Sequence, residues 1–175
     1  SIVREKETGT MEILLVSPMN SLFVILSKAV PYFVLSILNL TTILLLSFFV
    51  LDVPIAGSLT ALVGVSLVFI FVSLALGLLI SNVTQTQVAA MLASGMVLML
   101  PTIILSGIIF PIESMPGILQ GISCFIPARW YVSIVRRIMI EGVPFMYVWK
   151  ETAILLFMAV VLIGITTRTF KNRLE

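Results

Sequence analysis

The sequence contains no histidine and only one cysteine, Cys124. Without histidine, the chain has no imidazole for a metal site or for acid–base catalysis near neutral pH. A single cysteine allows neither a disulfide within the chain nor a cysteine-cluster metal site. The phosphate-binding pattern GxxxxGK[ST] is also missing, so these residues do not bind ATP in that way.

Charge is scarce as well. Only 10% of the 175 residues are charged, against about 25% in a typical soluble domain. The chain is 60% hydrophobic with a mean hydropathy of +1.23, and no charge occurs from residue 53 to residue 112. This run is far longer than the roughly 20 residues of one transmembrane helix. The composition predicts an integral membrane protein. The net charge of +2 says little about partners, and we expect no nucleic acid among them.

Apolar segments predict an all-α integral membrane fold with four spans at about 22–51, 58–80, 88–105 and 148–167. Pro54 and Gly57 indicate a tight turn after the first span, and residues 81–87 indicate a polar, uncharged loop after the second. Lys28 lies just inside the first span, where we expect its stem to snorkel to the interface. Pro101 is expected to bend the third span.

The segment 106–142 is too broken by proline and glycine for one span and too apolar for a free loop. We expect a broken re-entrant hairpin of two short helices, 117–125 and 128–141, because irregular backbone at membrane depth must be covered by protein or line a cavity. The second helix is amphipathic. It either anchors the chain to lipid headgroups or belongs to an extracytoplasmic gate, with the candidate residues Phe110, Pro111, Glu113, Pro116, Arg129 and Trp130.

Residues 1–20 form the one densely charged segment before the apolar body, and residues 21–175 form the transmembrane domain. Gly9 interrupts the segment, Thr10 is a candidate N-cap, and residues 11–16 are expected to form a short helix that Ser17-Pro18 ends. The charges fit either a solvated face beside the membrane or a contact with a soluble partner. The segment has no signal-peptide pattern, and we expect it to belong to a longer chain that begins upstream.

Four spans place both ends of the segment on one side of the membrane. Six basic residues then lie on or near that side, and four lie on the other: Arg4, Lys6, Lys28, Arg168, Lys171 and Arg173 against Arg129, Arg136, Arg137 and Lys150. The positive-inside rule therefore favours a cytoplasmic location for both ends.

Three ordered stretches resemble the ABC-2 type transporter permeases, a class of exporters. The first, REKETGTMEILLVSP at residues 4–18, is similar to the family's cytoplasmic coupling segment, E-K-E-x-G-T-x-E-x-L-L-x-[ST]-P. The second, LSGIIFPIESMP at 105–116, and the third, IPARWYVSIVRRIMIEG at 126–142, resemble the region before the last span. The likeness covers the whole chain and is strongest to the branch of multidrug permeases. Since that family has six spans, the chain resembles its C-terminal part.

The resemblance implies the transmembrane subunit of an ATP-driven exporter in a bacterial inner or plasma membrane. The chain would pair with a second permease subunit, identical or different, and with a separate ABC ATPase subunit that binds ATP and Mg. It would itself hold no cofactor and no catalytic residue. The resemblance does not fix the substrate, but the apolar faces of the spans fit a hydrophobic or amphipathic one. The implied ATPase-coupling residues are Glu5, Lys6, Glu7, Gly9, Thr10, Glu12, Leu14, Leu15 and Pro18.

The sequence also bears on other classes of membrane protein. A passive transporter or channel favours charges inside the membrane, and the second and third spans have none. An intramembrane enzyme needs paired catalytic groups at depth, and the chain has no histidine and no pair of acids there. A membrane scaffold that does not transport remains open, and an associated ATPase would exclude it.

Overall fold

The computed structural model describes residues 2–16 and 20–172, and this part of the chain is helical without a strand. Two short helices come first, α1 (Ile2–Thr8) and α2 (Met11–Val16). Four helices long and apolar enough to cross a membrane follow among the described residues. The predicted all-α class, the four spans and the short helix near the start are confirmed.

The spans differ from the prediction mainly at their ends. They are α3 (Ser21–Phe49), α4 (Leu59–Val83), a third span from Gln87 to Leu105, and α9 (Trp149–Asn172). The predicted loop 81–87 is therefore wrong in its first part, because α4 continues to Val83. The last helix continues five residues beyond 167, since Phe170 is buried against Val24 and Ile25 of α3.

The third span has three parts: α5 (Gln87–Ala93), a π-helical segment (Ser94–Met99) and α6 (Leu100–Leu105). Pro101 lies at the start of α6. A proline in a helix removes a donor and clashes with the preceding turn, and π-helical turns are a usual place where helices bend. The disturbance that the sequence predicts at Pro101 is thus a π-helical segment in the turns just before it.

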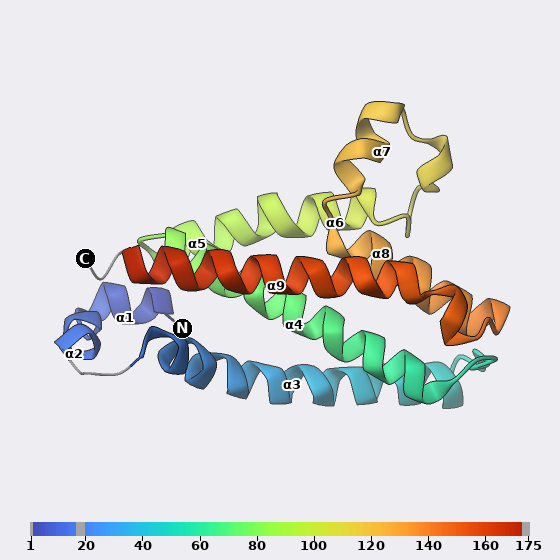
Figure 1. Ribbon diagram of the computed structural model, residues 1–175, viewed down its shortest axis with the longest axis horizontal. Helices are drawn as coiled ribbons and strands as arrows, with labels where there is room; N and C mark the ends of the chain where they lie inside the picture. The colour runs from blue at the N-terminus through green and yellow to red at the C-terminus, as the bar shows by residue number, and fades with distance from the viewer. Residues whose placement is uncertain (1, 17–19, 173–175) are drawn as a thin grey trace.

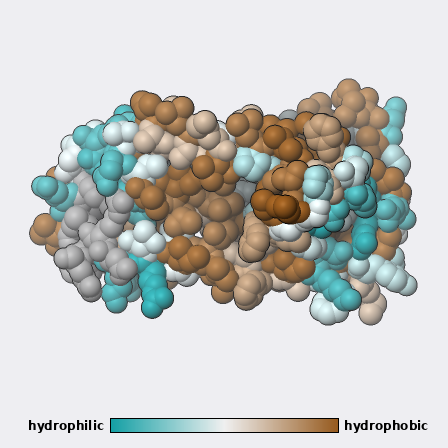
Figure 2. Space-filling model, turned by 90° about the horizontal axis from the view of Figure 1, so that it is seen from above, coloured by the Kyte–Doolittle hydropathy of each residue, from teal (hydrophilic) through white to brown (hydrophobic). Residues whose placement is uncertain are grey.

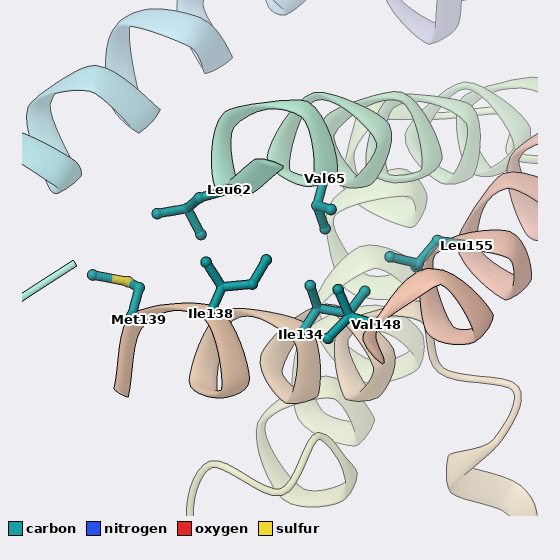
Figure 3. Packing of buried hydrophobic residues seen from close by; sticks show 7 residues of the cluster. All are labelled: Leu62, Val65, Ile134, Ile138, Met139, Val148 and Leu155. Carbon is teal, nitrogen blue, oxygen red and sulfur yellow. The ribbon is translucent and has the colours of Figure 1, made fainter. Parts of the chain in front are cut away.

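The packed centre of the protein lies between α4, α9 and α8 (Pro127–Arg136). Figure 3 shows Leu62 and Val65 of α4 facing Ile134 and Ile138, with Val148 and Leu155 beside them. By contrast, α3 and the third span keep many large apolar side chains exposed. In Figure 2 apolar residues cover the middle of the molecule and hydrophilic ones gather at its two ends, as expected for a bilayer-spanning body.

The predicted broken hairpin is confirmed as α7 (Gly117–Ser123) and α8, which continues as a π-helical segment (Arg137–Glu141). The two meet at the α7–α8 bend, residues 124–126, at an angle of 89°. Helix α7 projects from the bundle, whereas α8 lies along α4 and α9 (Figure 1). The apolar face of α8 therefore packs on protein, with Ile134 and Ile138 fully buried.

The connection between α3 and α4 packs closely against the end of α8. The amide of Ala56 donates to the carbonyl of Met139 at 3.1 Å. A Cβ placed on Gly57 would lie 2.6 Å from the carbonyl oxygen of Ile138, closer than real Cβ atoms come. Glycine at this position therefore allows two backbones to meet.

The described ends of the chain, α1 with α2 and the end of α9, lie at the same end of the bundle, together with the α4–α5 turn (Figure 1). This arrangement follows from four antiparallel crossings. It places the charged first segment beside the ends of several spans.

Candidate functional site

The charged segment is built on α1, which lies across the end of α4. Its first two described side chains, Ile2 and Val3, are 2% and 1% exposed. The amide of Val3 donates to Oγ of Ser81 at 3.2 Å. Apolar burial and this hydrogen bond attach α1 to the bundle, and the charged side chains of α1 add further contacts.

Glu5 forms an ion pair with Lys28 of α3. Both side chains are largely shielded, with 20% and 30% of their surface exposed, so bulk water screens the pair less than it would on an open surface. Lys28 therefore has a protein partner at the place where sequence reasoning expected only snorkelling. The charge of Glu5 was a signal for this pair, but the sequence did not indicate which base it meets.

Lys6 binds the end of α4. Its Nζ donates to the carbonyl oxygens of Ser81, Asn82 and Thr84 at 3.2, 2.6 and 3.2 Å. The last carbonyls of a helix have no partner within the helix and carry partial negative charge. A lysine from a distant segment satisfies them here, which explains why α4 extends into the predicted loop.

Glu7 binds the start of α5. Its two carboxylate oxygens accept hydrogen bonds from the amide of Gln87 at 2.7 Å and from its Nε2 at 2.6 Å. Thr86 completes the cap by accepting from the amide of Ala89 at 3.2 Å. A carboxylate at a helix N-terminus suits the positive end of the helix dipole.

Gly9 and Thr10 join α1 to α2. Gly9 adopts φ +73°, a left-handed conformation that costs other residues more than glycine. The hydroxyl of Thr10 lies 3.0 Å from that of Thr8 and donates to the carbonyl of Glu5 at 3.4 Å. Thr10 precedes α2 as predicted, but these contacts direct its hydroxyl towards α1.

Helix α2 projects from this base. Ile13 is 73% exposed and Val16 86% exposed, and Glu12 is exposed without an ion pair among the residues that the structure describes. Of the other predicted coupling residues, Pro18 and the side chains of Leu14 and Leu15 lie outside the described part. An apolar and acidic surface is therefore presented to whatever lies beyond this end of the bundle.

The structure divides the predicted gate residues into two groups. Phe110, Pro111, Glu113 and Pro116 are exposed in the connection that leads to α7. Arg129 and Trp130 instead hold the α7–α8 bend. Within the described ranges, no hydrogen bond or ion pair joins one group to the other. The gate assignment stays a prediction.

The α7–α8 bend is held by contacts over a short stretch of chain. Nη1 of Arg129 donates to the carbonyl of Gln120 at 3.0 Å and to Oγ of Ser123 at 2.6 Å. Its guanidinium also lies 5.0 Å from the ring centre of Trp130. The indole of Trp130 in turn donates to the carbonyl of Cys124 at 3.0 Å.

Sequence reasoning missed two buried polar contacts between helices. Asn82 is fully buried, and its Nδ2 donates to the carbonyl of Thr166 in α9 at 3.4 Å. Tyr131 of α8 lies 2.7 Å from Oγ of Ser66 in α4 and stacks on Phe69 at 4.3 Å. A polar residue within a long apolar segment was the available signal, since such groups need partners.

An apolar cavity of about 290 Å³ lies between α3, α4 and α9, lined by side chains that include Phe33, Phe71 and Leu74. It has almost no polar surface, so its chemistry suits hydrocarbon. Across the described ranges, no three metal-ligating side chains converge.

Comparison with known proteins gives a family. The family described as "ABC-2 family transporter protein" matches residues 1–168. The chain is 38% identical over 175 residues to "Probable multidrug ABC transporter permease YbhS" of Escherichia coli K12, covering 99% of this chain and 46% of that protein. It is 32% identical over 151 residues to "Probable multidrug ABC transporter permease YbhR" of the same organism, covering 86% and 41%.

A eukaryotic protein is similar as well. "ABC transporter G family member 20" of Dictyostelium discoideum is 28% identical over 175 residues, covering 99% of this chain and 24% of that protein. No solved structure matches. The chain spans about half the length of the bacterial relatives that it matches, 46% in one case.

The match over nearly the whole length means that the chain belongs to the ABC-2 family of transporter proteins, and the resemblance seen in the three sequence stretches is confirmed. The apolar helices and the relatives together identify a multi-pass membrane protein.

Proposed function

We propose that this chain is the membrane-spanning permease part of an ATP-driven ABC-2 exporter. A separate ABC ATPase subunit binds ATP and Mg, and its hydrolysis drives efflux of a hydrophobic or amphipathic substrate. The chain itself is not an ATPase and holds no cofactor. It works with a second permease subunit, identical or different.

The observation that carries this proposal is the contrast between α1 and α2. Helix α1 is fixed to the ends of three spans, while α2 beside it exposes Ile13, Val16 and Glu12. Exposed apolar side chains next to an unpaired acid are typical of a surface that a protein partner covers. An ATPase docked there would contact α2, and α2 is joined to α1, which is attached to the bundle.

The apolar cavity between α3, α4 and α9 supports the choice of substrate class, because it offers a hydrocarbon surface within the spans. The exposed apolar faces of α3 and of the third span leave room for a second permease subunit or further spans of the parent chain.

The proposal is tested on the full-length parent protein, expressed with its native neighbours and extracted in mild detergent. We expect an ABC ATPase to copurify. Glu12→Ala should leave membrane insertion intact but reduce transport and stimulated ATP hydrolysis. Glu141→Ala is the matched control. It also removes one exposed acid, but Glu141 ends the π-helical segment that contacts the α3–α4 connection, at the other end of the bundle.

Two results would contradict the proposal. Unchanged transport by a normally expressed Glu12→Ala protein would remove the coupling role of Glu12. If no ATPase copurified under any nucleotide condition, a passive transporter or a membrane scaffold would become the better assignment.

We also propose that both described ends of the chain lie in the cytoplasm. The exposed Cys124 near the α7–α8 bend gives a direct test. In intact cells a membrane-impermeant maleimide should label Cys124, whereas a cysteine introduced by Glu12→Cys in a Cys124→Ser background should react only after permeabilisation. The reverse pattern would invert the orientation.

A further inference from the structure

Three consecutive residues of α1 contact three different spans. Glu5 pairs with Lys28 of α3, Lys6 binds the last carbonyls of α4, and Glu7 binds the first turn of α5. We call Glu5, Lys6 and Glu7 the three-point attachment. Their partners lie 23 to 80 positions away in the chain, so the folded bundle brings these contacts together.

The signs of the charges match what the helix ends lack. Helix α4 has no basic residue in its last turn, and Lys6 supplies one. Helix α5 has no acidic residue in its first turn, and Glu7 supplies one. Each charge thus complements the partial charge of the helix end that it meets. The α4–α5 turn is therefore bound on one side by Lys6 and on the other by Glu7, which are neighbours in α1.

The same helix is joined to α2 by a short, defined connection. Only Gly9 and Thr10 separate the two helices, and the Thr10 hydroxyl donates to the carbonyl of Glu5. A displacement of α2 is therefore passed to α1 through only two connecting residues. At the other end of α1, Ile2 and Val3 are buried and the amide of Val3 donates to Oγ of Ser81 in α4. A shift of α1 would therefore strain this contact together with those of Lys6 and Glu7.

We propose that Glu5, Lys6 and Glu7 are positioning residues that connect α2 to α3, α4 and α5 at once. Their charges act within the chain, and contact with the partner is left to α2. A movement of α2 then reaches the start of α3 and the α4–α5 turn together. This transmission rests on the proposed function, whereas the attachment itself does not.

The first experiment is a charge exchange in the full-length protein with its ATPase in lipid nanodiscs. Glu5→Lys and Lys28→Glu are compared with the double variant and with Arg4→Glu, an exposed control on the same helix. Each single variant should keep the ATPase bound and lower substrate-stimulated ATP hydrolysis about fivefold. The double variant should recover most of it, and the control should resemble wild type.

Recovery shows that the Glu5–Lys28 pair, and not either charge alone, is what ATP hydrolysis depends on. Because the exchange would also repair a fold weakened by loss of the pair, the unfolding midpoints of the single variants are measured too, and positioning requires that they stay near wild type. The proposal is overturned if the double variant is no better than the worse single one, or if both singles resemble wild type. Loss of ATPase binding in Glu5→Lys alone would also overturn it, since Glu5 would then contact the partner directly.

The second experiment does not depend on transport. Hydrogen exchange of the amides in residues 84–90 should be faster in Glu7→Ala than in wild type, because the amide of Gln87 loses its acceptor. Arg4→Ala should leave it unchanged. If the wild-type protein bound no ATPase, the proposed function would fail. The hydrogen exchange of residues 84–90 would still test whether Glu7 holds the start of α5. Unaltered exchange in Glu7→Ala would reject this attachment.

Discussion

The two ends of the bundle are held together in different ways. At the α1 end, charged side chains reach helix ends that are distant in the sequence, as Lys6 does at Asn82. At the opposite end, backbone packs directly on backbone, as Gly57 does at Ile138. The charged contacts there join residues closer in the sequence: Arg137 pairs with Glu151, 14 positions away, and Arg129 holds the α7–α8 bend over nine residues or fewer. Charge contacts can be broken and remade with little rearrangement, whereas close packing resists movement.

In the proposed exporter, the α1 end would receive the motion of the ATPase, and the close backbone contact at Gly57 would resist it. An end attached by ion pairs and carbonyl contacts depends on the positions of several elements at once. Where backbone meets backbone, as at Gly57, a small shift already brings atoms into overlap. The following predictions test this difference.

The largest effect is expected from Gly57→Val. The new side chain would overlap the carbonyl of Ile138, a backbone atom that cannot rotate away. Overpacking of this kind costs about 2 kcal/mol or more, and the thermal unfolding midpoint in detergent should fall. Gly64→Ala is the control, because its Cβ meets open space. An unchanged midpoint for Gly57→Val would show that the opposite end is loosely packed.

A smaller loss is expected from Lys6→Met, which keeps an apolar stem but removes the ammonium from three carbonyls. Leaving such groups without their charged donor costs about 1–2 kcal/mol. Arg4→Met is the matched control on an exposed position of the same helix. Equal unfolding midpoints for the two variants would mean that water replaces Lys6 without cost.

Arg129→Met should have a weaker and more local effect. Its partners, Gln120 and Ser123, belong to the same short segment, so their loss should loosen α7 without releasing the bundle. We expect about 1 kcal/mol, seen as faster proteolysis between residues 117 and 126. Arg136→Met is the control, since its side chain makes one long contact, 3.4 Å to the carbonyl of Gly107. Loss of the whole fold would contradict this local role.

The smallest effect on stability is expected at Gly9. A β-branched residue is disfavoured at φ +73°. Gly9→Val should relieve this local strain by redirecting α2, so the bundle should lose less stability than in Arg129→Met. Gly9→Asn should stay closer to wild type, because asparagine tolerates this conformation. The amount of ATPase that copurifies reports whether α2 keeps its direction. Equal binding by the two variants would show that Gly9 does not set the direction of α2.

Features that depend on local sequence could be predicted well. Hydropathy located all four spans. In lipid each span must satisfy its backbone hydrogen bonds within its own helix, so it is a continuous apolar segment that the sequence shows directly. Proline and glycine located the break before α7, and Gly9 the step between α1 and α2. The ends of α4 and α9 were predicted too short. Lys6 extends α4 and the burial of Phe170 extends α9, and neither contact is visible in a local pattern.

The charged first segment was predicted as a separate part of the chain, but which of its residues contact the bundle was not. The segment at residues 4–18 was singled out by its charge density and by its family likeness. Glu5, Lys6 and Glu7 were expected to act together with Glu12. In the structure these three side chains contact α3, α4 and α5, although Glu7 stays exposed, and Glu12 is exposed as well.

The sequence by itself determined the class of protein, the number of spans and the place of the polar segment, since these follow from the transfer of apolar residues out of water and from backbone restrictions along the chain. Only the tertiary structure decided which acid meets which base, which helix end Lys6 caps and where two backbones touch. Those contacts join residues far apart in the chain, and their geometry exists only once the helices have packed.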